Sequence, residues 1–332
     1  MTLREIAAIA HVSPASVSLV LNNKPGVSDA KRQGIQALLQ KYQYGVPKAG
    51  VAAARQLLFL KYMRNGLVVE KNTGFVASIL DAIEAECRSL QYTLRIEVCR
   101  ENLADYIQQA DFSQLDGVFV LGTELGADEY PVLERIPLPY VVLDNRMPDH
   151  PCVSITMNNH EMVHIAIRHA FSLGYRRIGY LKSSMHIQNF DDRSEAFFEE
   201  VRSLSMECGN NDVFELDPSP MGAYTDMSNF LKNGRTLPPC VFADNDTIAL
   251  GAMRAFSESG IRVPENISII GFDDISFSAM NGLSTMHVST DRLGRMAVRI
   301  MDYVLHSEDL RDCKLLMGGR LVPRQSTVPY VS

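Results

Sequence analysis

The chain has 332 residues, 46% of them hydrophobic and 21% charged, which is the composition of a globular protein with a core large enough to be stable without cross-links. Its six cysteines lie far apart, and no apolar run of about 18 residues or signal-like opening occurs, so we expect a cytoplasmic protein without a disulfide framework. The net charge of −7 combines +5 over residues 1–55 with −12 over the remainder, so the amino-terminal part is suited to meet a polyanion.

Residues 1–45 are predicted to form three short helices. Thr2 stands three residues before a glutamate, which is the spacing of a capping box at the start of the first helix. The second helix follows Ser13 as its N-cap, with Pro14 in the first helical position, and Ser28 caps the third helix. Apolar residues recur at helical spacing on these segments: Leu3, Ile6, Ala7, Ala10, Val17, Val20, Leu21, Ile35, Leu38, Leu39 and Tyr42.

Two short helices joined by a tight turn, with a third helix closing the core, form a helix-turn-helix. Such a unit lays its second helix in the major groove, while nearby polar side chains bond to phosphates, so we expect double-stranded DNA as the partner. A helical cap that touches nothing is the alternative, and the basic charge favours DNA. The candidate base-facing residues are Pro14, Ala15, Ser16 and Leu19, the candidate phosphate contacts are Ser13, Ser18 and Asn22, and Thr2, Ser28 and Tyr44 complete the predicted set.

This part of the chain resembles the lactose-repressor (LacI) family of bacterial transcription regulators, in the segment TLREIAAIAHVSPASVSLVLNNKPGVSDAKRQGIQALLQKYQY. The resemblance implies that Pro14, Ala15 and Leu19 stand at base-reading positions. Leu19 departs from the family pattern, which often has an arginine there that bonds a guanine. Because leucine offers only an apolar contact, the operator sequence does not transfer from the family to this chain.

Residues 46–56 are predicted to be a linker, within the segment YGVPKAGVAAARQLL. The LacI family typically has the pattern Y.PNA.AR.L here, a hinge helix that orders on DNA and wedges a leucine into the minor groove. Tyr44 matches the family tyrosine, whereas Pro47 replaces the asparagine, Ala53 stands at the leucine position, and Gly50 weakens a helix. We predict a degenerate hinge that bends DNA less than is usual in the family, and an alternative register stays open.

From residue 57 onward, strand-like apolar runs alternate with helix-period segments. This alternation predicts two α/β parts with doubly wound parallel sheets and a ligand at the carboxyl ends of the strands. The predicted strands cover residues 57–62, 93–98, 117–121, 140–143, 152–155, 177–181, 213–216, 240–243 and 267–271. The predicted helices cover residues 75–90, 161–173, 193–204, 223–231, 247–259 and 293–305.

The remainder of the chain also resembles the LacI family, in PCVFADNDTIALGAMRAFSESGIRVPENISIIGFDDISFS and in the terminal GGRLVPRQST. The resemblance implies an effector-binding and dimerisation domain over residues 57–332 that is similar to periplasmic sugar-binding proteins, with a chain that crosses three times between two subdomains. The N-subdomain is expected at about 57–157 and 290–319, and the C-subdomain at about 158–289 and 320–332.

The same resemblance supplies candidate effector-binding residues. Arg193 in DDRSEAF matches an arginine that contacts ligand hydroxyls or a carboxylate, and Asp273 in IIGFDD matches a strand-end aspartate that accepts from sugar hydroxyls. Asn245 in ADNDTIALGA has a similar strand-end position, and Asn72 and Phe75 in EKNTGF stand where the family has NPFF. Donors and acceptors on an aromatic floor suit a polyol such as a sugar.

Each candidate has a structural alternative. An arginine–aspartate pair is often a core ion pair, Asn245 can cap the helix that follows it, and Phe75 can belong to the core. Spacing alone favours these alternatives. The resemblance favours a ligand role for Arg193 and Asp273, leaves the two interpretations of Asn245 and Phe75 level, and supports Asn72 less.

No catalytic constellation is predicted, because the chain has no GxxxxGK[ST], GxGxxG or GxSxG motif. His160 and His164 stand one helical turn apart, but without a further ligand this pair predicts no metal site. Adjacent aspartates do not flank a substrate as glycosidase acids must. We therefore expect no catalytic residues, no cofactor and no bound metal.

Together these features predict a cytoplasmic, nucleoid-associated transcription regulator, expected to be a repressor, that binds a sugar or sugar derivative between its subdomains. Two heads are needed for a two-part operator, so we expect a homodimer and no membrane partner. The alternative is a cytoplasmic sugar sensor whose DNA binding has decayed, which Leu19 and the altered linker favour. The sequence leaves open the effector's identity, whether it releases or promotes DNA binding, and whether genes are repressed or activated.

Overall fold

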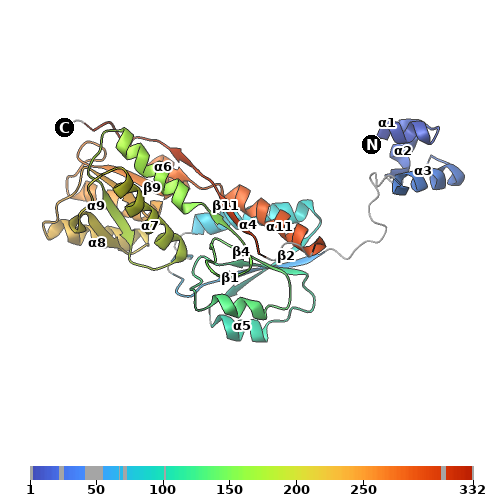
Figure 1. Ribbon diagram of the computed structural model, residues 1–332, viewed down its shortest axis with the longest axis horizontal. Helices are drawn as coiled ribbons and strands as arrows, with labels where there is room; N and C mark the ends of the chain where they lie inside the picture. Colours follow the sequence, from blue (N-terminus) through green and yellow to red (C-terminus); the bar gives the residue numbers. More distant parts are fainter. Residues whose placement is uncertain are drawn as a thin grey trace. The chain divides into compact units, whose positions relative to one another are not determined.

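The computed structural model describes residues 3–21, 26–41, 55–66, 68–69, 73–100, 102–307 and 312–330 of the chain. The chain forms two compact units, Met1–Ala54 and Arg55–Ser332, called here the head and the body (Figure 1). Within the described residues, no helix combines the length and the apolar character that crossing a membrane requires.

The described residues of the head form the helices α1 (Leu3–Ile9), α2 (Pro14–Leu21) and α3 (Asp29–Lys41) (Figure 1). Their apolar faces meet in one small core, as the helical spacing predicted, because residues three and four apart share one side of a helix. This core consists of Ile6, Ala7, Val17, Val20, Ile35 and Leu39. The expected roles of the Thr2, Leu21 and Tyr42 side chains lie outside the described part of the chain.

Local hydrogen bonds build the turn between α1 and α2. His11 has a left-handed backbone with a φ of 52°, and the amide of Val12 donates to the carbonyl of Ala7 at 3.0 Å. The amide of Ser16 then donates to Ser13 Oγ at 3.1 Å, which satisfies one of the free amides in the first turn of α2. The predicted N-cap of the second helix is therefore confirmed.

The first half of the body, called lobe 1, is built on a six-stranded parallel sheet with the order β11-β5-β4-β3-β1-β2. One face is covered by α4 (Thr73–Ser89) and α11 (Thr290–His306), and the other by α5 (Leu103–Gln109) and the short helix η1 (Tyr130–Arg135) (Figure 1). The strands are β1 (Gln56–Tyr62), β2 (Thr93–Cys99), β3 (Gly117–Leu121), β4 (Tyr140–Leu143), β5 (Val153–Met157) and β11 (Lys314–Met317).

The second half, called lobe 2, has a six-stranded sheet with the order β12-β10-β9-β8-β6-β7, in which only β12 is antiparallel to its neighbour. The strands are β6 (Gly179–Ser183), β7 (Val213–Leu216), β8 (Cys240–Ala243), β9 (Ser268–Asp273), β10 (Ser284–His287) and β12 (Arg320–Val322). One face packs against α6 (Asn159–Ser172) and α7 (Gln188–Ser203), and the other against α8 (Pro220–Lys232) and α9 (Asp246–Glu258). The short helices are α10 (Ser276–Met280) and η2 (Asn210–Asp212).

Both lobes have the same order for their first five strands, in which the first strand lies between the second and the third. The chain passes from lobe 1 to lobe 2 between β5 and α6, returns before α11, and passes again between β11 and β12. The loops that follow parallel strands of such sheets surround the ligand site. The predicted fold class, a helix-turn-helix head with two doubly wound sheets, is confirmed.

Several elements differ from their predicted bounds. The helix α7 begins at Gln188, well before the predicted start at 193, and β9 continues to Asp273. The elements α5, α10, β10 and β11 were not predicted. A short segment such as β10 (Ser284–His287) shows too little periodicity to be recognised, and it is stabilised by pairing with strands already in the sheet.

Candidate functional site

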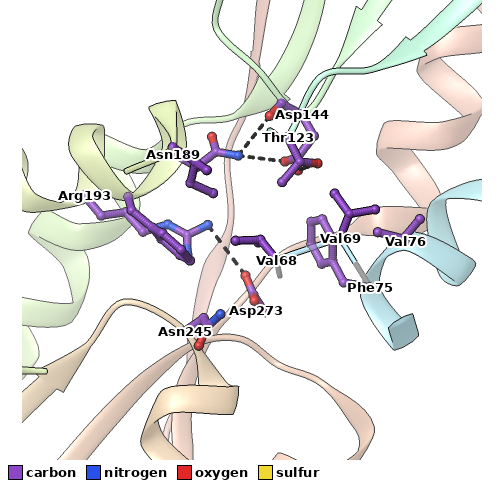
Figure 2. A pocket seen from close by; sticks show the side chains of 12 residues that line it. Val68, Val69, Phe75, Val76, Thr123, Asp144, Asn189, Arg193, Asn245 and Asp273 are labelled. Atoms are coloured by element: carbon purple, nitrogen blue, oxygen red, sulfur yellow. Dashed lines mark hydrogen bonds and ion pairs between the residues drawn. The ribbon is translucent and has the colours of Figure 1, made fainter. Parts of the chain in front are cut away.

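A cavity lies between the two lobes of the body, with about 350 Å³ of space that is partly open to solvent. Little of this space admits the centre of a water molecule, so a ligand of sugar size requires the wall side chains or the lobes to move apart. Figure 2 shows side chains from both lobes around it. They belong to Val68, Val69, Phe75, Val76, Thr123, Asp144, Ile187, Asn189, Phe190, Arg193, Asn245 and Asp273.

Arg193 lies on α7 and is 3% exposed, so its charge depends on partners within the protein. Its Nε donates to Asn159 Oδ1 at 2.9 Å, and its Nη1 donates to the carbonyl of Asp244. Its Nη2 lies 3.6 Å from Asp273 Oδ1 (Figure 2), and the guanidinium stacks 3.7 Å from the centre of the Phe272 ring. Arg193 and Asp273 therefore form the buried ion pair of the structural alternative, and both also line the cavity, in a network that already holds the cation.

Asp273 ends β9 at the carboxyl edge of the lobe 2 sheet. It is buried and has a φ of 113°, a conformation that side chains other than glycine rarely adopt. The next residue, Asp274, accepts from Arg324 Nη2 at 2.6 Å and lies 2.9 Å from His287 Nδ1. The two adjacent aspartates thus have separate roles, since Asp274 joins ion pairs beside the sheet while Asp273 lines the cavity.

Asn245 follows β8 and caps α9, because its Oδ1 accepts from the amide of Ile248 at 2.9 Å. The capping interpretation is therefore confirmed, and a ligand in the cavity would meet the amide NH₂ of this side chain. Phe75, in the first turn of α4, is buried beside the cavity together with Val69 and Val76 (Figure 2). Asn72 lies outside the described residues.

Three polar residues of the cavity, Thr123, Asp144 and Asn189, were not predicted from the sequence. Asp144 directly follows β4 and accepts from Thr123 Oγ1 at 2.5 Å and from Asn189 Nδ2 at 3.0 Å (Figure 2). Asn189 stands one helical turn before Arg193 on α7. A signal for Asp144 was present, because it directly follows a buried parallel strand, and the family resemblance had selected Asp273 at a similar strand end.

Two aspartates that contact this network have raised pKa values. Burial raises the pKa of Asp144 to about 6, although the hydrogen bond from Thr123 and the charge of Arg193 oppose the change. Burial likewise raises the pKa of Asp244 to about 6, against the hydrogen bonds from the Ser183 amide and the Tyr180 hydroxyl. Asp144, which lines the cavity, and Asp244, whose carbonyl accepts from Arg193, therefore bind protons more tightly than exposed carboxyl groups do.

Six of the candidate DNA-binding side chains lie in the described part of the head. Ser13 and Pro14 are exposed, and their neighbour Ser16 is half-buried with its Oγ 3.0 Å from Ser13 Oγ. Leu19 is half-buried and lies next to Gly26, so that a Cβ added to this glycine would stand 3.3 Å from Leu19 Cδ1. Ser18 is half-buried and Ser28 is exposed, whereas Thr2, Asn22, Tyr44 and the side chain of Ala15 lie outside the described part.

Two family models match the chain. Residues 2–46 match "Bacterial regulatory proteins, lacI family", and residues 167–327 match "Periplasmic binding protein-like domain". The first covers the described helices of the head, and the second covers most of lobe 2 together with α11 and β11.

Whole-chain relatives point the same way. The HTH-type transcriptional repressor PurR of Mannheimia succiniciproducens is 29% identical over 98% of both chains, and that of Actinobacillus pleuropneumoniae is 28% identical over 90% of both. Among solved structures, the transcriptional regulator CelR–cellobiose complex has a TM-score of 0.71 at 23% identity and covers 98% of this chain and all of that one. The lac repressor dimer bound to operator and the anti-inducer ONPF has a TM-score of 0.73 at 21% identity and covers 99% of both.

Proposed function

The chain belongs to the LacI family of bacterial regulatory proteins and is a DNA-binding transcriptional repressor with an effector domain, and from this premise we propose that a sugar or sugar derivative bound between the lobes controls its affinity for operator DNA. As a member of a family of transcription regulators, it is not an enzyme. We assign DNA binding to residues 1–45, the linker role to 46–56, and effector binding and dimerisation to 57–332.

The proposed DNA contact is the start of α2 with its flanking turns. The first turn of α2 has no acidic residue, and the positive partial charge at a helix N-terminus suits a phosphate. The exposed side chains of Ser13 and Pro14 are the first that a duplex would meet on this helix. We propose that Ala15, Ser16 and Leu19 join Pro14 in facing bases, and that the other contacts come from Thr2, Ser13, Ser18, Asn22, Ser28 and Tyr44.

The proposed effector site is the cavity between the lobes, and the observation that carries it is the buried pair of Arg193 on α7 and Asp273 at the carboxyl end of β9. A guanidinium, a carboxylate and the amide of Asn245 offer donors and acceptors to hydroxyl groups, while Phe75 supplies an apolar wall. The cellobiose bound to the related regulator CelR supports a carbohydrate.

The proposed mechanism is a change in the relative orientation of the lobes. A ligand that contacts both walls of the cavity favours the lobe arrangement in which both walls reach it, and in a homodimer that arrangement alters how two heads meet one operator. By thermodynamic linkage, operator DNA then changes the affinity for the effector by the same factor. We place this activity in the cytoplasm, at the nucleoid.

DNA binding is tested by fluorescence anisotropy with full-length protein and duplexes from the region upstream of its own gene, over a series of salt concentrations. We expect affinity to fall steeply with salt, because phosphate contacts release counterions. Pro14→Glu puts a negative charge at the exposed start of α2, where glutamate is compatible with a helix, and should abolish binding. Gln108→Glu, an equal charge change on the exposed side of α5, is the control and should bind as the parent does.

Effector binding is tested by a thermal-shift screen of sugars and sugar phosphates, because a ligand that binds only the folded protein raises its Tm. Each hit is then measured by calorimetry on the parent, Arg193→Lys and Asp273→Asn, and added to the protein–DNA complex. Salt-sensitive DNA binding without any sugar that changes Tm or DNA affinity would contradict the carbohydrate effector. A sugar that binds to a protein without affinity for any duplex would instead support the alternative of a cytoplasmic sugar sensor.

A further inference from the structure

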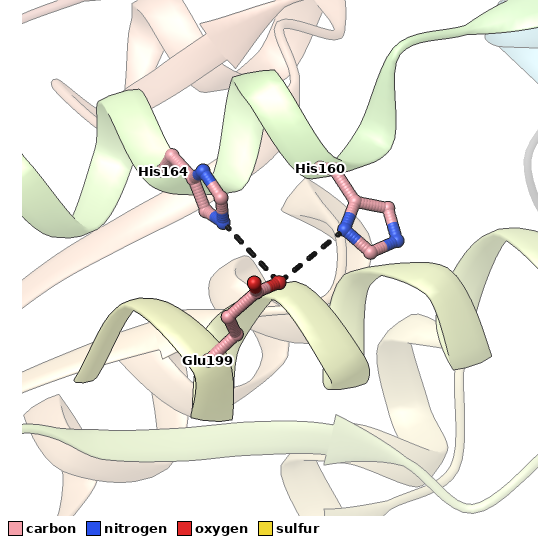
Figure 3. Close-up of side chains that lie close together, drawn as sticks. All are labelled: His160, His164 and Glu199. Atoms are coloured by element: carbon pink, nitrogen blue, oxygen red, sulfur yellow. Dashed lines mark ion pairs between the residues drawn. The ribbon is translucent and has the colours of Figure 1, made fainter. Parts of the chain in front are cut away.

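Two helices of lobe 2 bring three potential metal ligands together, away from the cavity between the lobes. His160 and His164 stand one turn apart on α6, and Glu199 faces them from α7 (Figure 3). One oxygen of Glu199, Oε2, lies 3.8 Å from His160 Nδ1 and 3.9 Å from His164 Nε2. The sequence alone predicted no metal site here, because Glu199 joins the histidines only through the packing of α7 on α6.

The geometry suits a small cation between these three side chains. Their facing atoms all lie within 4.8 Å of one another. Tetrahedral Zn²⁺ with bonds of about 2.0–2.1 Å separates neighbouring ligand atoms by roughly 3.3–3.4 Å. Adjustments of a few tenths of an ångström to an ångström in exposed or half-buried side chains therefore complete the site, and water can fill the remaining coordination position.

The outward nitrogen of each histidine faces a further carboxylate. Glu195 Oε2 lies 3.7 Å from His160 Nε2, and Glu200 Oε2 lies 3.7 Å from His164 Nδ1. Glu200 is buried and also accepts from Arg168 Nε at 2.5 Å, which holds it in place. Histidines that bind metals usually donate their other ring N–H to such a group, which turns the free lone pair toward the metal.

One of the facing nitrogens is also unsatisfied. His164 Nε2 is buried and has no hydrogen-bond partner, although it points toward Glu199 (Figure 3). A buried polar atom that has lost water without gaining a partner destabilises the fold. A cation held between His160, His164 and Glu199 removes this cost, since it accepts the lone pair of that nitrogen.

We propose that His160, His164 and Glu199 form a binding site for a divalent transition-metal ion of the Zn²⁺ type. Imidazole nitrogens with one carboxylate select Zn²⁺, Co²⁺ or Ni²⁺ over Mg²⁺ and Ca²⁺, which prefer sites made of oxygen ligands. Asp192 belongs to a second possible grouping with His160, but its carboxylate is already held by Arg146 at 3.0 and 3.2 Å.

The site binds a metal without hydrolytic chemistry. Residues 160–164 read His-Glu-Met-Val-His, the pattern in which zinc proteases use the glutamate as a general base. Here Glu161 Oε2 accepts from Asn158 Nδ2 at 3.0 Å, at the amino-terminal end of α6. The ion would instead clamp α6 to α7, the two helices that supply Asn159 and Arg193 to the network beneath the cavity.

The test uses untagged full-length protein that has been stripped of metal with a chelator. It is titrated with Co²⁺, whose visible absorption reports coordination number and ligand type, and then with Zn²⁺, which displaces Co²⁺. The variants are His164→Gln and the nearly isosteric Glu199→Gln. The matched control is His186→Gln, because His186 is an exposed histidine 3.1 Å from a carboxylate oxygen of Asp191. Thermal melts without metal verify that all variants fold.

We expect one ion per chain with micromolar or tighter affinity, and a rise in Tm on adding Zn²⁺. Changes next to a metal ligand typically weaken affinity by about 10–100-fold, so loss of a direct ligand in His164→Gln or Glu199→Gln should weaken it at least that much. His186→Gln should bind as the parent does. The proposal is overturned by absence of binding at micromolar metal, by unchanged affinity in both ligand variants, or by an equal loss in the control.

Discussion

The two lobes of the body share one strand order but give the cavity different chemistry. Each sheet ends a parallel strand at the cavity with an aspartate, Asp144 after β4 in lobe 1 and Asp273 at the end of β9 in lobe 2. Lobe 1 surrounds its aspartate with apolar side chains and the hydroxyl of Thr123, whereas lobe 2 adds a buried guanidinium and two amides. A shared topology therefore determines where strand ends meet, while a few side chains decide what they can bind.

The lobes also share a packing device that is independent of the ligand site. In lobe 1, a Cβ on Gly294 of α11 would stand 2.7 Å from the Ile79 carbonyl of α4. In lobe 2, a Cβ on Gly251 of α9 would stand 2.8 Å from the Pro220 carbonyl of α8. Each helix pair thus crosses closely at a glycine, which shows that the lobes are alike in their scaffold and differ in their polar groups.

The largest effect is expected from removing the buried guanidinium of Arg193 in lobe 2. Arg193→Met keeps a long side chain but takes away the charge that faces Asp273 and the donor to the Asp244 carbonyl. Breaking a buried pair typically lowers the free energy of unfolding by about 3–5 kcal/mol. Urea denaturation measures this, with Arg254→Met as control, because the Arg254–Glu258 pair is exposed and should contribute far less. Equal urea midpoints for Arg193→Met and the parent would show that lobe 2 does not depend on its guanidinium.

The next largest effect is expected at the two helix crossings. Gly251→Ala and Gly294→Ala should each destabilise the body by about 1–3 kcal/mol through overpacking, and the higher helix propensity of alanine offsets only part of this. Calorimetric melting measures both. Gly34→Ala in α3 is the control: its Cβ meets nothing within 4 Å, so it should stabilise the head by about 0.5–1 kcal/mol. If alanine at one of the two crossings leaves the melting temperature unchanged, the two lobes do not share this packing feature.

The effect of pH on the free energy of unfolding should differ between the lobes, because lobe 2 has more buried carboxyl groups with a raised pKa than lobe 1. Burial raises the pKa of Asp144 in lobe 1, and of Asp244 and Asp246 in lobe 2, to about 6. Because these groups bind protons more tightly when folded, their contribution to the free energy of unfolding falls as pH rises from about 4 to about 6 and is level above that. Each group should account for about 3 kcal/mol, because a rise of about two pKa units corresponds to about 1.4 kcal/mol per unit.

Urea midpoints at several pH values, taken as the difference between the parent and each variant, measure this contribution. Asp144→Asn should remove the pH dependence that comes from lobe 1. Asp244→Asn and Asp246→Asn should together remove the larger pH dependence that comes from lobe 2. If the contribution of these carboxyls to the free energy of unfolding instead increases as pH rises, they are ionised throughout the range.

The smallest effect is expected from Thr123→Val, which removes one donor to Asp144 while Asn189 still donates to the same carboxylate. The loss should be about 0.5–1.5 kcal/mol in the free energy of unfolding. The pKa of Asp144 should rise further, because this hydrogen bond lowers it, and an NMR titration of the carboxyl carbon would detect the change. Thr225→Val, at an exposed hydroxyl that donates to the Met221 carbonyl, is the control.

Much of this architecture was predictable from local patterns. The helical faces of the head, the N-cap at Ser13 and the alternation of strands and helices follow from residue spacing, which acts over a few residues. The four candidates Phe75, Arg193, Asn245 and Asp273 do line one cavity, and their ligand roles stay a prediction. Asn189 was not recognised, because its place in the cavity depends on α7 starting earlier than its pattern indicated.

The amino-acid sequence by itself determined most of the segments that become strands and helices, since backbone propensity and hydrophobic periodicity are local properties, whereas short elements such as β10 depended on pairing within the sheet. Only the tertiary structure decided which strand ends share a cavity, and that Glu199 lies opposite His160 and His164. Contacts between segments far apart in the chain are set by how whole helices and sheets pack. That packing depends on all buried surfaces together, and no single stretch of residues contains it.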